Sequence, residues 1–363
     1  MQILREDIEF IHKQIQICKS RFRGKKILIT GCSGFLGFEL ALFFLCKMEA
    51  LGIAKITLYD IKYPRNLLAA AKLLGVDLAS SEIEFKSASG SCLGDFGEHF
   101  PFNFIFHLAS IASPSVYRKF PLETIHTNTT MLRELLDLAR LNMGTELDGF
   151  LVMSSSEIYG DPHQDWIPTP EAYNGNVSCV GPRACYDESK RLAETLSWIY
   201  RHHYDMNIRV ARPFNNFGPG LATSDGRLPA DLASAVLEKK DIALYSDGTP
   251  TRTFCYISDA VILYLRHIAS VSPNYTLNIG NQQNEISVSL LAESYRDIGS
   301  DMFGYGGSIS YKPSDDKDYL AYNPNRRCPD VSLATATLGY TARVPVQEGI
   351  RRYLSYLHSD SSD

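Results

Sequence analysis

The sequence predicts an α/β fold in which a doubly wound parallel sheet is followed by a smaller C-terminal lobe. Over the first 212 residues, short apolar runs rich in β-branched residues alternate with helix-length segments. That alternation is typical of parallel sheets covered by helices on both faces. A glycine-rich turn follows the first apolar run, and a Tyr-x-x-x-Lys pair lies in a later helix-length segment. Beyond residue 212, turns rich in Gly, Pro and Asn separate shorter segments, which favours a second lobe.

The expected elements follow one another in a regular order. Residues 1–24 are expected to form a helical extension, because Ile8, Ile11 and Ile15 recur at helical spacing. Strands are expected at 26–30, 55–60, 83–85, 104–108, 150–153 and 208–211, with helices at 34–51, 65–74, 121–141 and 184–204. Some segments beyond residue 212 are expected to return to the main sheet.

Composition excludes several classes of protein. The formal charge is −5 and the isoelectric point about 6.0, which argues against nucleic acid as the main partner. Eight cysteines are scattered without a CxxC pair or zinc-ligand spacing, so we expect free thiols, no metal and a cytoplasmic location. The N-terminus lacks a signal-peptide core, and the apolar run 40–46 is too short to span a bilayer. We therefore expect no membrane partner.

The glycine-rich turn marks the junction between the first strand and the first helix of the sheet. Its positions singled out as cofactor contacts are Gly31, Gly34, Phe35, Leu36 and Gly37. Glycines at this junction permit close approach of the backbone to a pyrophosphate at the N-terminus of the following helix. Asp60 ends the second strand, where a carboxylate accepts hydrogen bonds from an adenosine ribose and repels a 2′-phosphate. The pattern predicts a Rossmann-type domain that binds NAD.

The Tyr-x-x-x-Lys pair is the candidate chemical site. Tyr186 and Lys190 lie one turn apart, so both side chains share a face of the helix expected at 184–204. A free phenol has a pKa of about 10 and is a poor base, but a nearby ammonium and a positive nicotinamide ring lower that pKa. Ser155 follows the strand 150–153, at the edge where open parallel sheets bind ligands. These residues predict removal of a proton from a sugar hydroxyl, with hydride delivered to NAD.

The sequence around the pair is more specific than the pair itself. Residues 183–191 read Arg-Ala-Cys-Tyr-Asp-Glu-Ser-Lys-Arg, and further matching segments lie at 107–110, 156–161, 251–259, 278–280 and 329–330. With these segments, the chain resembles the extended short-chain dehydrogenases/reductases that act on nucleotide sugars. Among them it most resembles the UDP-glucuronate decarboxylases (UDP-xylose synthases), from about Lys26 to the C-terminal region.

This resemblance implies a reaction and a set of contacts. C4 loses hydride to NAD while its hydroxyl loses a proton, which gives a 4-keto sugar; carbon dioxide then leaves, C5 is reprotonated, and the hydride returns to C4 to give UDP-xylose. Glu157 is implied to lie near the sugar ring and to assist placement of water or a proton. Further implied cofactor contacts are Leu108, Ser110 and Thr127, together with Tyr186 and Lys190. Implied substrate contacts are Tyr117, Ser156, Arg183, Asn215, Arg227 and Arg252. A homodimer built on the helices at 121–141 and 184–204 is also implied.

Two departures from the family pattern stand out. Position 155 is Ser where Thr is common, which keeps a hydroxyl at that place. Residues 87–90 read Ser-Ala-Ser-Gly near the place where the family usually has an Asp at the adenine. The sugar or the nucleotide of this chain can therefore differ from UDP-glucuronate.

Three other functions remain open at this point. A nucleotide-sugar 4,6-dehydratase shares the 4-keto intermediate, but it usually needs an Asp-Glu pair where this chain has Ser156 and Glu157. A C4 epimerase shares Tyr-x-x-x-Lys but does not normally carry the longer sequence around it. A non-catalytic dinucleotide-binding regulator usually loses the Tyr or the Lys, and both are present here.

The expected organisation therefore has four parts. Residues 1–24 are an N-terminal helical extension, and 25–212 an NAD-binding domain that also carries the catalytic residues. Residues 213–358 are mainly a substrate-binding lobe, and 359–363 a tail.

Overall fold

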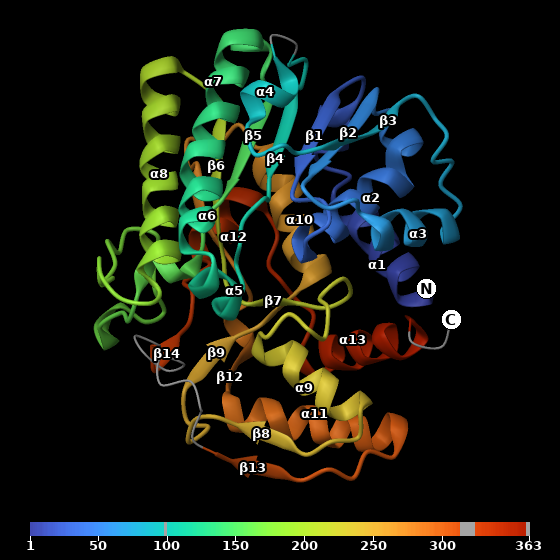
Figure 1. Ribbon diagram of the computed structural model, residues 1–363, viewed down its shortest axis with the longest axis vertical. Helices are drawn as coiled ribbons and strands as arrows, with labels where there is room; N and C mark the ends of the chain where they lie inside the picture. Colours follow the sequence, from blue (N-terminus) through green and yellow to red (C-terminus); the bar gives the residue numbers. More distant parts are fainter. Residues whose placement is uncertain (98–99, 313–323, 361–363) are drawn as a thin grey trace.

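A seven-stranded parallel sheet forms the centre of the computed structural model, which describes residues 1–97, 100–312 and 324–360 (Figure 1). The strand order is β11-β6-β5-β4-β1-β2-β3. The strands are β1 (Lys26–Thr30), β2 (Lys55–Asp60), β3 (Ile83–Ser87), β4 (Phe104–His107), β5 (Gly149–Met153), β6 (Ile208–Pro213) and β11 (Thr276–Ile279). The predicted doubly wound α/β fold is confirmed, and all six expected strands lie in this sheet.

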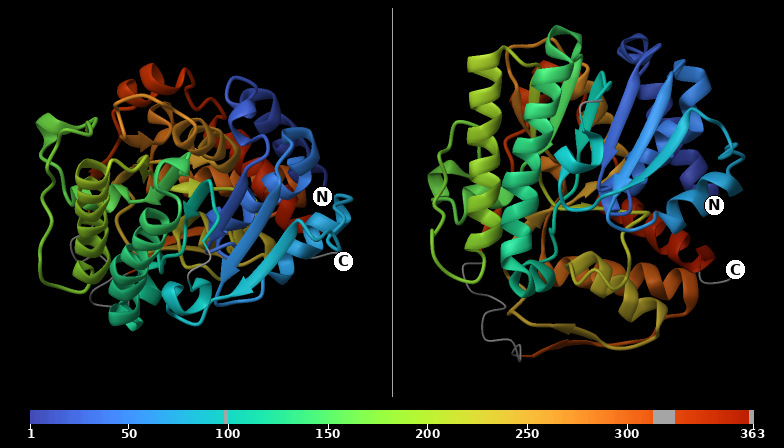
Figure 2. Two further views of the ribbon diagram at one scale, coloured as in Figure 1. Left: turned by 90° about the horizontal axis from the view of Figure 1, so that it is seen from above. Right: turned by 45° about the horizontal axis from the view of Figure 1, so that its top comes forward.

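Two layers of helices cover the sheet, and the view from above in Figure 2 shows the sheet between them. One layer contains α1 (Gln2–Gln14), α2 (Phe35–Leu51), α3 (Arg65–Leu73) and α10 (Ile257–Ile268), and the other α4 (Cys92–Phe96), α7 (Leu132–Asn142) and α8 (Ala184–Tyr204). Strand residues alternate between the two cores: Ile27 and Ile29 pack on the first layer, whereas Leu28 packs on the second. The apolar runs of the sequence are continuous because both faces of the strands are buried.

The helix expected at 121–141 is interrupted in the structure. It consists of α6 (Pro121–Ile125), a π-helical turn η2 (His126–Met131) and α7. The turn buries Asn128, and such bulges are frequent at functional sites. Helical periodicity alone does not reveal one extra residue per turn, so this break was not expected.

A second lobe lies beyond the carboxyl ends of the parallel strands (Figure 1). Its helices are α9 (Leu228–Leu237) and α11 (Val288–Phe303). Its strands pair as β8 (Ile242–Leu244) with β13 (Ile309–Tyr311), and as β9 (Thr251–Thr253) between β12 (Glu285–Ser287) and β14 (Arg326–Arg327). Helix α13 (Val346–Asp360) covers residues 359 and 360 of the expected tail, and positions 361–363 lie outside the described residues.

Helix α1 is tied to the rest of the protein by a buried polar cluster. Its Asp7 accepts hydrogen bonds from the Tyr256 hydroxyl at 2.6 Å and from Arg352 Nη2 at 3.0 Å. Its apolar face joins the core through Leu4, Ile8 and Ile11. Among the helices that the structure describes, none has the length and apolar character needed to cross a bilayer.

The strand order creates a crevice at one place in the sheet. The chain runs from β1 to β2 and β3 on one side, and then places β4 on the other side of β1. Connections on either side of such a switch point diverge, so the carboxyl ends of β1 and β4 form a ligand-binding crevice in open parallel sheets.

Candidate active site

The turn after β1 has the shape of a cradle for a ligand's phosphates. Gly31 has a φ of +70°, and a Cβ there would lie 2.6 Å from the backbone nitrogen of Ala109. A Cβ on Gly37 would lie 2.0 Å from the carbonyl oxygen of Gly31. Both positions therefore require glycine. Helix α2 begins at Phe35 without a side-chain cap, which leaves N–H groups of its first turn available to an anion.

Asp60 connects this turn to β2. Its Oδ2 accepts from the backbone N–H of Ser33 at 2.9 Å, and its Oδ1 accepts from that of Lys62 at 2.9 Å. The carboxylate is 9% exposed, so it lies at the edge of the crevice rather than in open solvent. Its position fits the predicted contact with an adenosine ribose. The glycine cradle, the uncapped helix and this carboxylate together fit NAD.

The carboxyl end of β4 forms the opposite wall of the crevice. Leu108 and Ser110 are half-buried there, and the Ser110 hydroxyl donates to Asn128 Oδ1 at 2.8 Å. Asn128 Nδ2 in turn donates to the Ser189 hydroxyl on α8 at 2.9 Å. Sequence reasoning missed Asn128. The hydroxyl of Thr127 donates to the carbonyl of Glu123, one turn earlier in α6, at 2.8 Å.

Tyr186 and Ser155 are brought together as expected. Tyr186 lies in the first turn of α8 and is 6% exposed, and the Ser155 side chain is close enough to its phenol to lower the pKa of that phenol. Ser155 also accepts from the backbone N–H of Glu157 at 3.2 Å and thereby caps the 3-10 helix η4 (Ser156–Tyr159), whose first residue Ser156 is buried. Burial raises the pKa of Tyr186 to about 12, and the Ser155 side chain opposes that rise. The phenol therefore needs an added positive charge, such as an oxidised nicotinamide, to act as a base.

Lys190 lies beside Tyr186 at the end of β5. Its ammonium donates to the carbonyl of Met153 at 2.8 Å and lies 5.7 Å from the ring centroid of Tyr186. It is 4% exposed, and burial lowers its pKa to about 7. The lysine therefore hydrogen-bonds to the end of β5 and acts on the Tyr186 phenol by its charge.

Tyr117 forms one wall beside the phenol. It comes from α5 (Pro114–Lys119), and its ring stacks on that of Tyr186 with centroids 5.0 Å apart and an interplanar angle of 11°. The ring is 1% exposed, and its hydroxyl has no hydrogen-bond partner within the described part of the chain. An unpaired buried hydroxyl is costly unless a ligand completes it. This supports the predicted contact of Tyr117 with a substrate.

Glu157 lies among arginines rather than free beside the sugar site. Arg327 forms a two-pronged ion pair with it, with Nη2 2.7 Å from Oε2, and Arg183 Nη2 also contacts that oxygen. Burial opposes ionisation of Glu157, but the two guanidinium groups outweigh burial and hold its pKa below the usual range. The side chain is therefore a fixed anion at neutral pH. Arg327 was not expected, although it lies two positions before Pro329-Asp330, which carry part of the resemblance.

Arg252 adds a third cation to this group. It lies opposite Arg327 in the parallel register of β9 and β14. Burial and the neighbouring Arg327 lower its pKa to about 9, and the carboxylates of Glu157 and Asp161 offset this only in part. An incoming anion would reduce the electrostatic repulsion among guanidinium groups that lie this close together.

Asp187 is a third unexpected residue at the site. Its Oδ2 lies 3.6 Å from Arg183 Nε, and its Oδ1 has no partner among the residues with described positions. Burial raises its pKa, and the negative charge of Glu157 raises it further. The structure thus places a carboxyl group with a raised pKa near one with a lowered pKa.

The remaining predicted contacts lie between the two lobes. Arg227 pairs with Asp225 at 2.9 Å and lies over the ring of Phe35, 5.4 Å from its centroid, which places it near the cofactor turn. Asn215 has a φ of +32°, and its amide donates to the carbonyl of Thr253 at 3.0 Å. Asn215 is therefore held by the second lobe at the border of the first.

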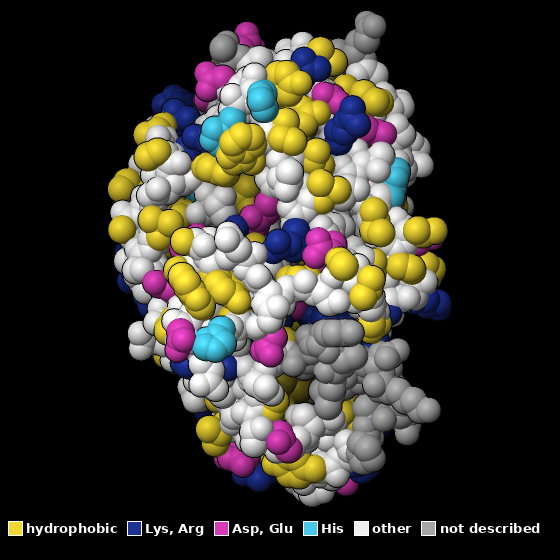
Figure 3. All heavy atoms as spheres, turned by 90° about the vertical axis from the view of Figure 1, so that its left-hand side faces the viewer, with side chains coloured by type: hydrophobic (Ala, Val, Ile, Leu, Met, Phe, Trp, Pro, Cys, Tyr) yellow, Lys and Arg dark blue, Asp and Glu magenta, His cyan; other side chains and the backbone are white. Residues whose placement is uncertain are grey.

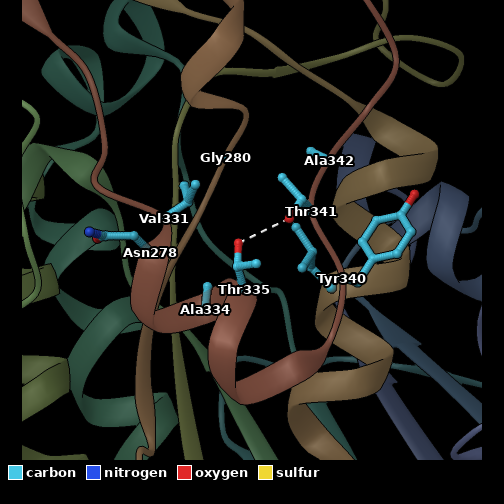
Figure 4. Close-up of a pocket in the computed structure, with 9 residues that line it drawn as sticks. Asn278, Gly280, Val331, Ala334, Thr335, Tyr340, Thr341 and Ala342 are labelled. Atoms are coloured by element: carbon cyan, nitrogen blue, oxygen red, sulfur yellow. Dashed lines mark hydrogen bonds between the residues drawn. The ribbon is translucent and has the colours of Figure 1, made fainter.

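A separate crevice lies behind the sheet, between α10 and α12 (Ser332–Leu338) (Figure 4). The hydroxyls of Thr335 and Thr341 are 3.1 Å apart across it. Its lining residues are Leu263, Asn278, Gly280, Val331, Ala334, Thr335, Tyr340, Thr341 and Ala342. It contains none of the predicted site residues, and we assign it no role in the chemistry.

Comparisons with known proteins are consistent with this geometry. The sequence profile of the NAD dependent epimerase/dehydratase family matches residues 27–280. UDP-glucuronic acid decarboxylase 1 of Xenopus tropicalis is 38% identical over 258 residues, which are 70% of this chain and 57% of that protein. UDP-glucuronic acid decarboxylase 3 of Arabidopsis thaliana is 37% identical over 246 residues, 68% of this chain and 67% of that protein. The chain thus spans less than two thirds of the X. tropicalis relative.

Solved structures show the same fold at lower identity. UDP-glucose 4-epimerase of Thermotoga maritima superposes with a TM-score of 0.74 at 22% identity, covering 93% of this chain and 99% of that one. UDP-glucuronic acid 4-epimerase of Bacillus cereus superposes with a TM-score of 0.74 at 20% identity, covering 92% and 99%.

Proposed function

The chain belongs to the NAD dependent epimerase/dehydratase family, and we propose that it decarboxylates a nucleotide-activated uronic acid, converting UDP-glucuronate to UDP-xylose. Relatives at 38% and 37% identity that are named UDP-glucuronic acid decarboxylases support this choice. The alternatives within the family are a 4,6-dehydratase and a C4 epimerase.

The observation that carries the proposal is the cluster of arginines beside Tyr186. Arg183, Arg252 and Arg327 all act on Glu157, whose charge is in turn felt by the Tyr186 phenol. A neutral hexose has no anionic group near its reacting carbons. A uronate carries a carboxylate on C5, next to the C4 that is oxidised, and a guanidinium binds a carboxylate through two parallel hydrogen bonds. The cluster therefore favours a uronate over a neutral sugar.

The proposed proton path uses residues already in contact. Tyr186 Oη removes the proton of the C4 hydroxyl, and Ser155 holds the phenol and that hydroxyl in line. Bound NAD supplies the hydride acceptor for C4 and later the hydride donor. Lys190 stabilises the negative charge on the phenolate through space from its place on the Met153 carbonyl.

The roles of the other residues follow from the chemistry of decarboxylation. A ketone at C4 accepts the electron pair that remains when carbon dioxide leaves, because the resulting carbanion is an enolate. We assign Arg327 and Arg183, held by Glu157, to the carboxylate end of the sugar. We assign Arg252 and Arg227 to the charged nucleotide diphosphate, and Tyr117, Ser156 and Asn215 to the sugar hydroxyls.

One observation favours the dehydratase as a second candidate. Elimination of water needs an acid beside a base, and Asp187, with its raised pKa, lies near Glu157. Asp187 is contacted by Arg183 and follows Tyr186 on the buried side of α8, so we rank this function below decarboxylation.

The test is a mass spectrum of UDP-glucuronate after incubation with the purified protein and NAD. Loss of carbon dioxide supports the decarboxylase, and Tyr186→Phe should abolish it. Loss of water would show a dehydratase instead of a decarboxylase. An unchanged mass with an inverted C4 in the NMR spectrum would show an epimerase, and an unchanged sugar would reject UDP-glucuronate as substrate.

We also propose a cytoplasmic homodimer. Apolar side chains of α6 and α8 are exposed, with Leu122 76%, Leu192 47% and Trp198 46% accessible. Figure 3 shows hydrophobic and histidine side chains gathered over the upper half of this side of the protein. Light scattering of Trp198→Glu should show a monomer if α8 forms the interface. The cytoplasmic assignment rests on eight free cysteines.

A further inference from the structure

The segment that carries Ser155, Ser156 and Glu157 is held at both ends by side chains that the proposed chemistry does not use. Before it, the Ser154 hydroxyl donates to Glu194 Oε1. After it, the Tyr159 hydroxyl accepts from Arg212 Nη1 at 2.7 Å and donates to Asn278 Oδ1 at 2.7 Å. Ser154 is 2% exposed and Tyr159 is fully buried.

The two anchors are joined to each other by a single ion pair. Arg212 Nε lies 2.8 Å from Glu194 Oε1, and Nη2 lies 2.6 Å from Oε2. This is the fork-to-fork geometry that restricts both side chains to one orientation. Arg212 is 8% exposed, and a buried pair of this kind is a weak source of net stability but a strong determinant of geometry.

The same pair also places helix α8. Tyr186, Lys190 and Glu194 follow one another at intervals of four residues and therefore share one face of the helix. Lys190 donates to the carbonyl of Met153, and Glu194 accepts from the next residue, Ser154. Two consecutive residues at the end of β5 are thus held by two consecutive turns of the helix that carries the phenol.

We propose that the Glu194–Arg212 pair, acting through Ser154 and Tyr159, is a positioning device that sets the Ser155 hydroxyl against the Tyr186 phenol. The proposal rests on the proposed function only for the assignment of Tyr186 as the base. Ser154, Tyr159, Glu194 and Arg212 touch no reacting atom and act only by fixing the segment between the anchors. Loss of an anchor lets the Ser155 side chain shift from its place beside the phenol, where it opposes the burial-driven rise in the pKa of Tyr186.

Ser154→Ala is the informative variant because it removes one anchor and leaves the ion pair in place. We expect kcat for the nucleotide sugar to fall about tenfold, the effect of one lost charge-assisted hydrogen bond, while KM changes less than about twofold. The basic limb of the pH–rate profile should move to higher pH, because the phenolate loses part of its stabilisation. Ser154→Thr keeps the hydroxyl and should restore both values.

Ser197→Ala is the matched control. Ser197 is a buried serine of α8 whose hydroxyl donates to the carbonyl of Ala193, within its own helix, at 2.7 Å. Its loss should lower Tm by a similar amount and leave kcat and the pH profile unchanged. Equal kcat and pH profiles for Ser154→Ala and Ser197→Ala would overturn the proposal and leave the pair a purely structural contact.

A second readout does not depend on turnover. In protein labelled with ¹³Cζ-tyrosine and saturated with NAD, the Tyr186 resonance is assigned by its loss in Tyr186→Phe. Its titration midpoint should be higher in Ser154→Ala than in the wild type and in Ser197→Ala. If the wild type converts no nucleotide sugar, the proposed function fails, and this titration still decides the positioning role. An identical midpoint in all three proteins would refute it.

Discussion

The ion pairs of Glu157 can be tested by a double-mutant cycle. Arg327→Met removes the two-pronged partner of Glu157 and leaves the carboxylate with Arg183. Glu157→Gln instead leaves Arg327 beside Arg252 and Arg183 without their shared anion. The double variant, Arg327→Met with Glu157→Gln, has neither the carboxylate that lost its main partner nor the unpaired positive charge of Arg327.

The magnitude follows from burial. Arg327 is 3% exposed, and removal of one partner from a buried pair costs about 3–5 kcal/mol. In Arg327→Met, Arg183 retains part of the pairing, and in Glu157→Gln the amide oxygen still accepts from the guanidinium groups, so we expect the lower end, about 3 kcal/mol, for each single variant. Unfolding entropy of about 2.1 cal/mol/K per residue means that a chain of 363 residues loses about 1 °C of Tm for each 0.8 kcal/mol. Each single variant should therefore melt about 4 °C lower than the wild type. The free energy of unfolding of the double variant should be at least about 2 kcal/mol higher than the value obtained by adding the losses of the two single variants.

Calorimetry at several pH values completes the test. The folded pKa of Glu157 is lowered, so its contribution is fully present above the unfolded pKa of about 4.3 and is lost as pH falls below it. The Tm deficit of Glu157→Gln should accordingly shrink on acidification. Additivity of the two single variants within about 0.5 kcal/mol, at neutral pH, would refute the coupling deduced here.

Three further predictions address other parts of the protein. Tyr186→Phe should lower kcat about a thousandfold with Tm nearly unchanged, because general bases contribute roughly 10²–10⁴-fold to the rate. Retention of more than a tenth of the activity, measured by mass spectrometry, would exclude Tyr186 as the base. Asp60→Ala should raise the Kd for NAD about tenfold and weaken the preference for NAD over NADP. The reason is that the Asp60 carboxylate both accepts from the Ser33 N–H and repels a 2′-phosphate. Unchanged Kd values for both cofactors in titration calorimetry would contradict this. Burial raises the pKa of Asp7 to about 6, so its ionised form is disfavoured in the folded protein and its contribution becomes less favourable as pH rises from about 4 to 6. Asp7→Asn should therefore gain stability relative to the wild type between pH 4 and pH 7, by about 2–3 kcal/mol in chemical denaturation, and a difference independent of pH would contradict the buried state of this carboxyl.

Local patterns in the chain were sufficient for the first half of the fold. Strands β1 and β2 have the residue bounds expected from their apolar runs, and α8 has the bounds expected from its periodicity. The glycine turn was recognisable because the need for glycine at Gly31 and Gly37 is a property of the backbone. The place of Ser155 followed from a general rule, since open parallel sheets bind ligands at the carboxyl ends of their strands and Ser155 follows β5.

Only the tertiary structure decided which charges meet at that edge. Arg327 lies 170 positions from Glu157 in the chain, and its place opposite Arg252 depends on the register of two short strands. No periodicity encodes such a pairing, because a register shift of one residue turns the side chain to the other face of the strand. The partner of Lys190 was likewise decided by packing: with β5 beneath α8, the Met153 carbonyl is the acceptor within reach. The sequence by itself therefore determined the fold and the candidate pair Tyr186 and Lys190, because these depend on local spacing. The tertiary structure determined the electrostatic setting of that pair, because burial and long-range contacts exist only in the folded chain.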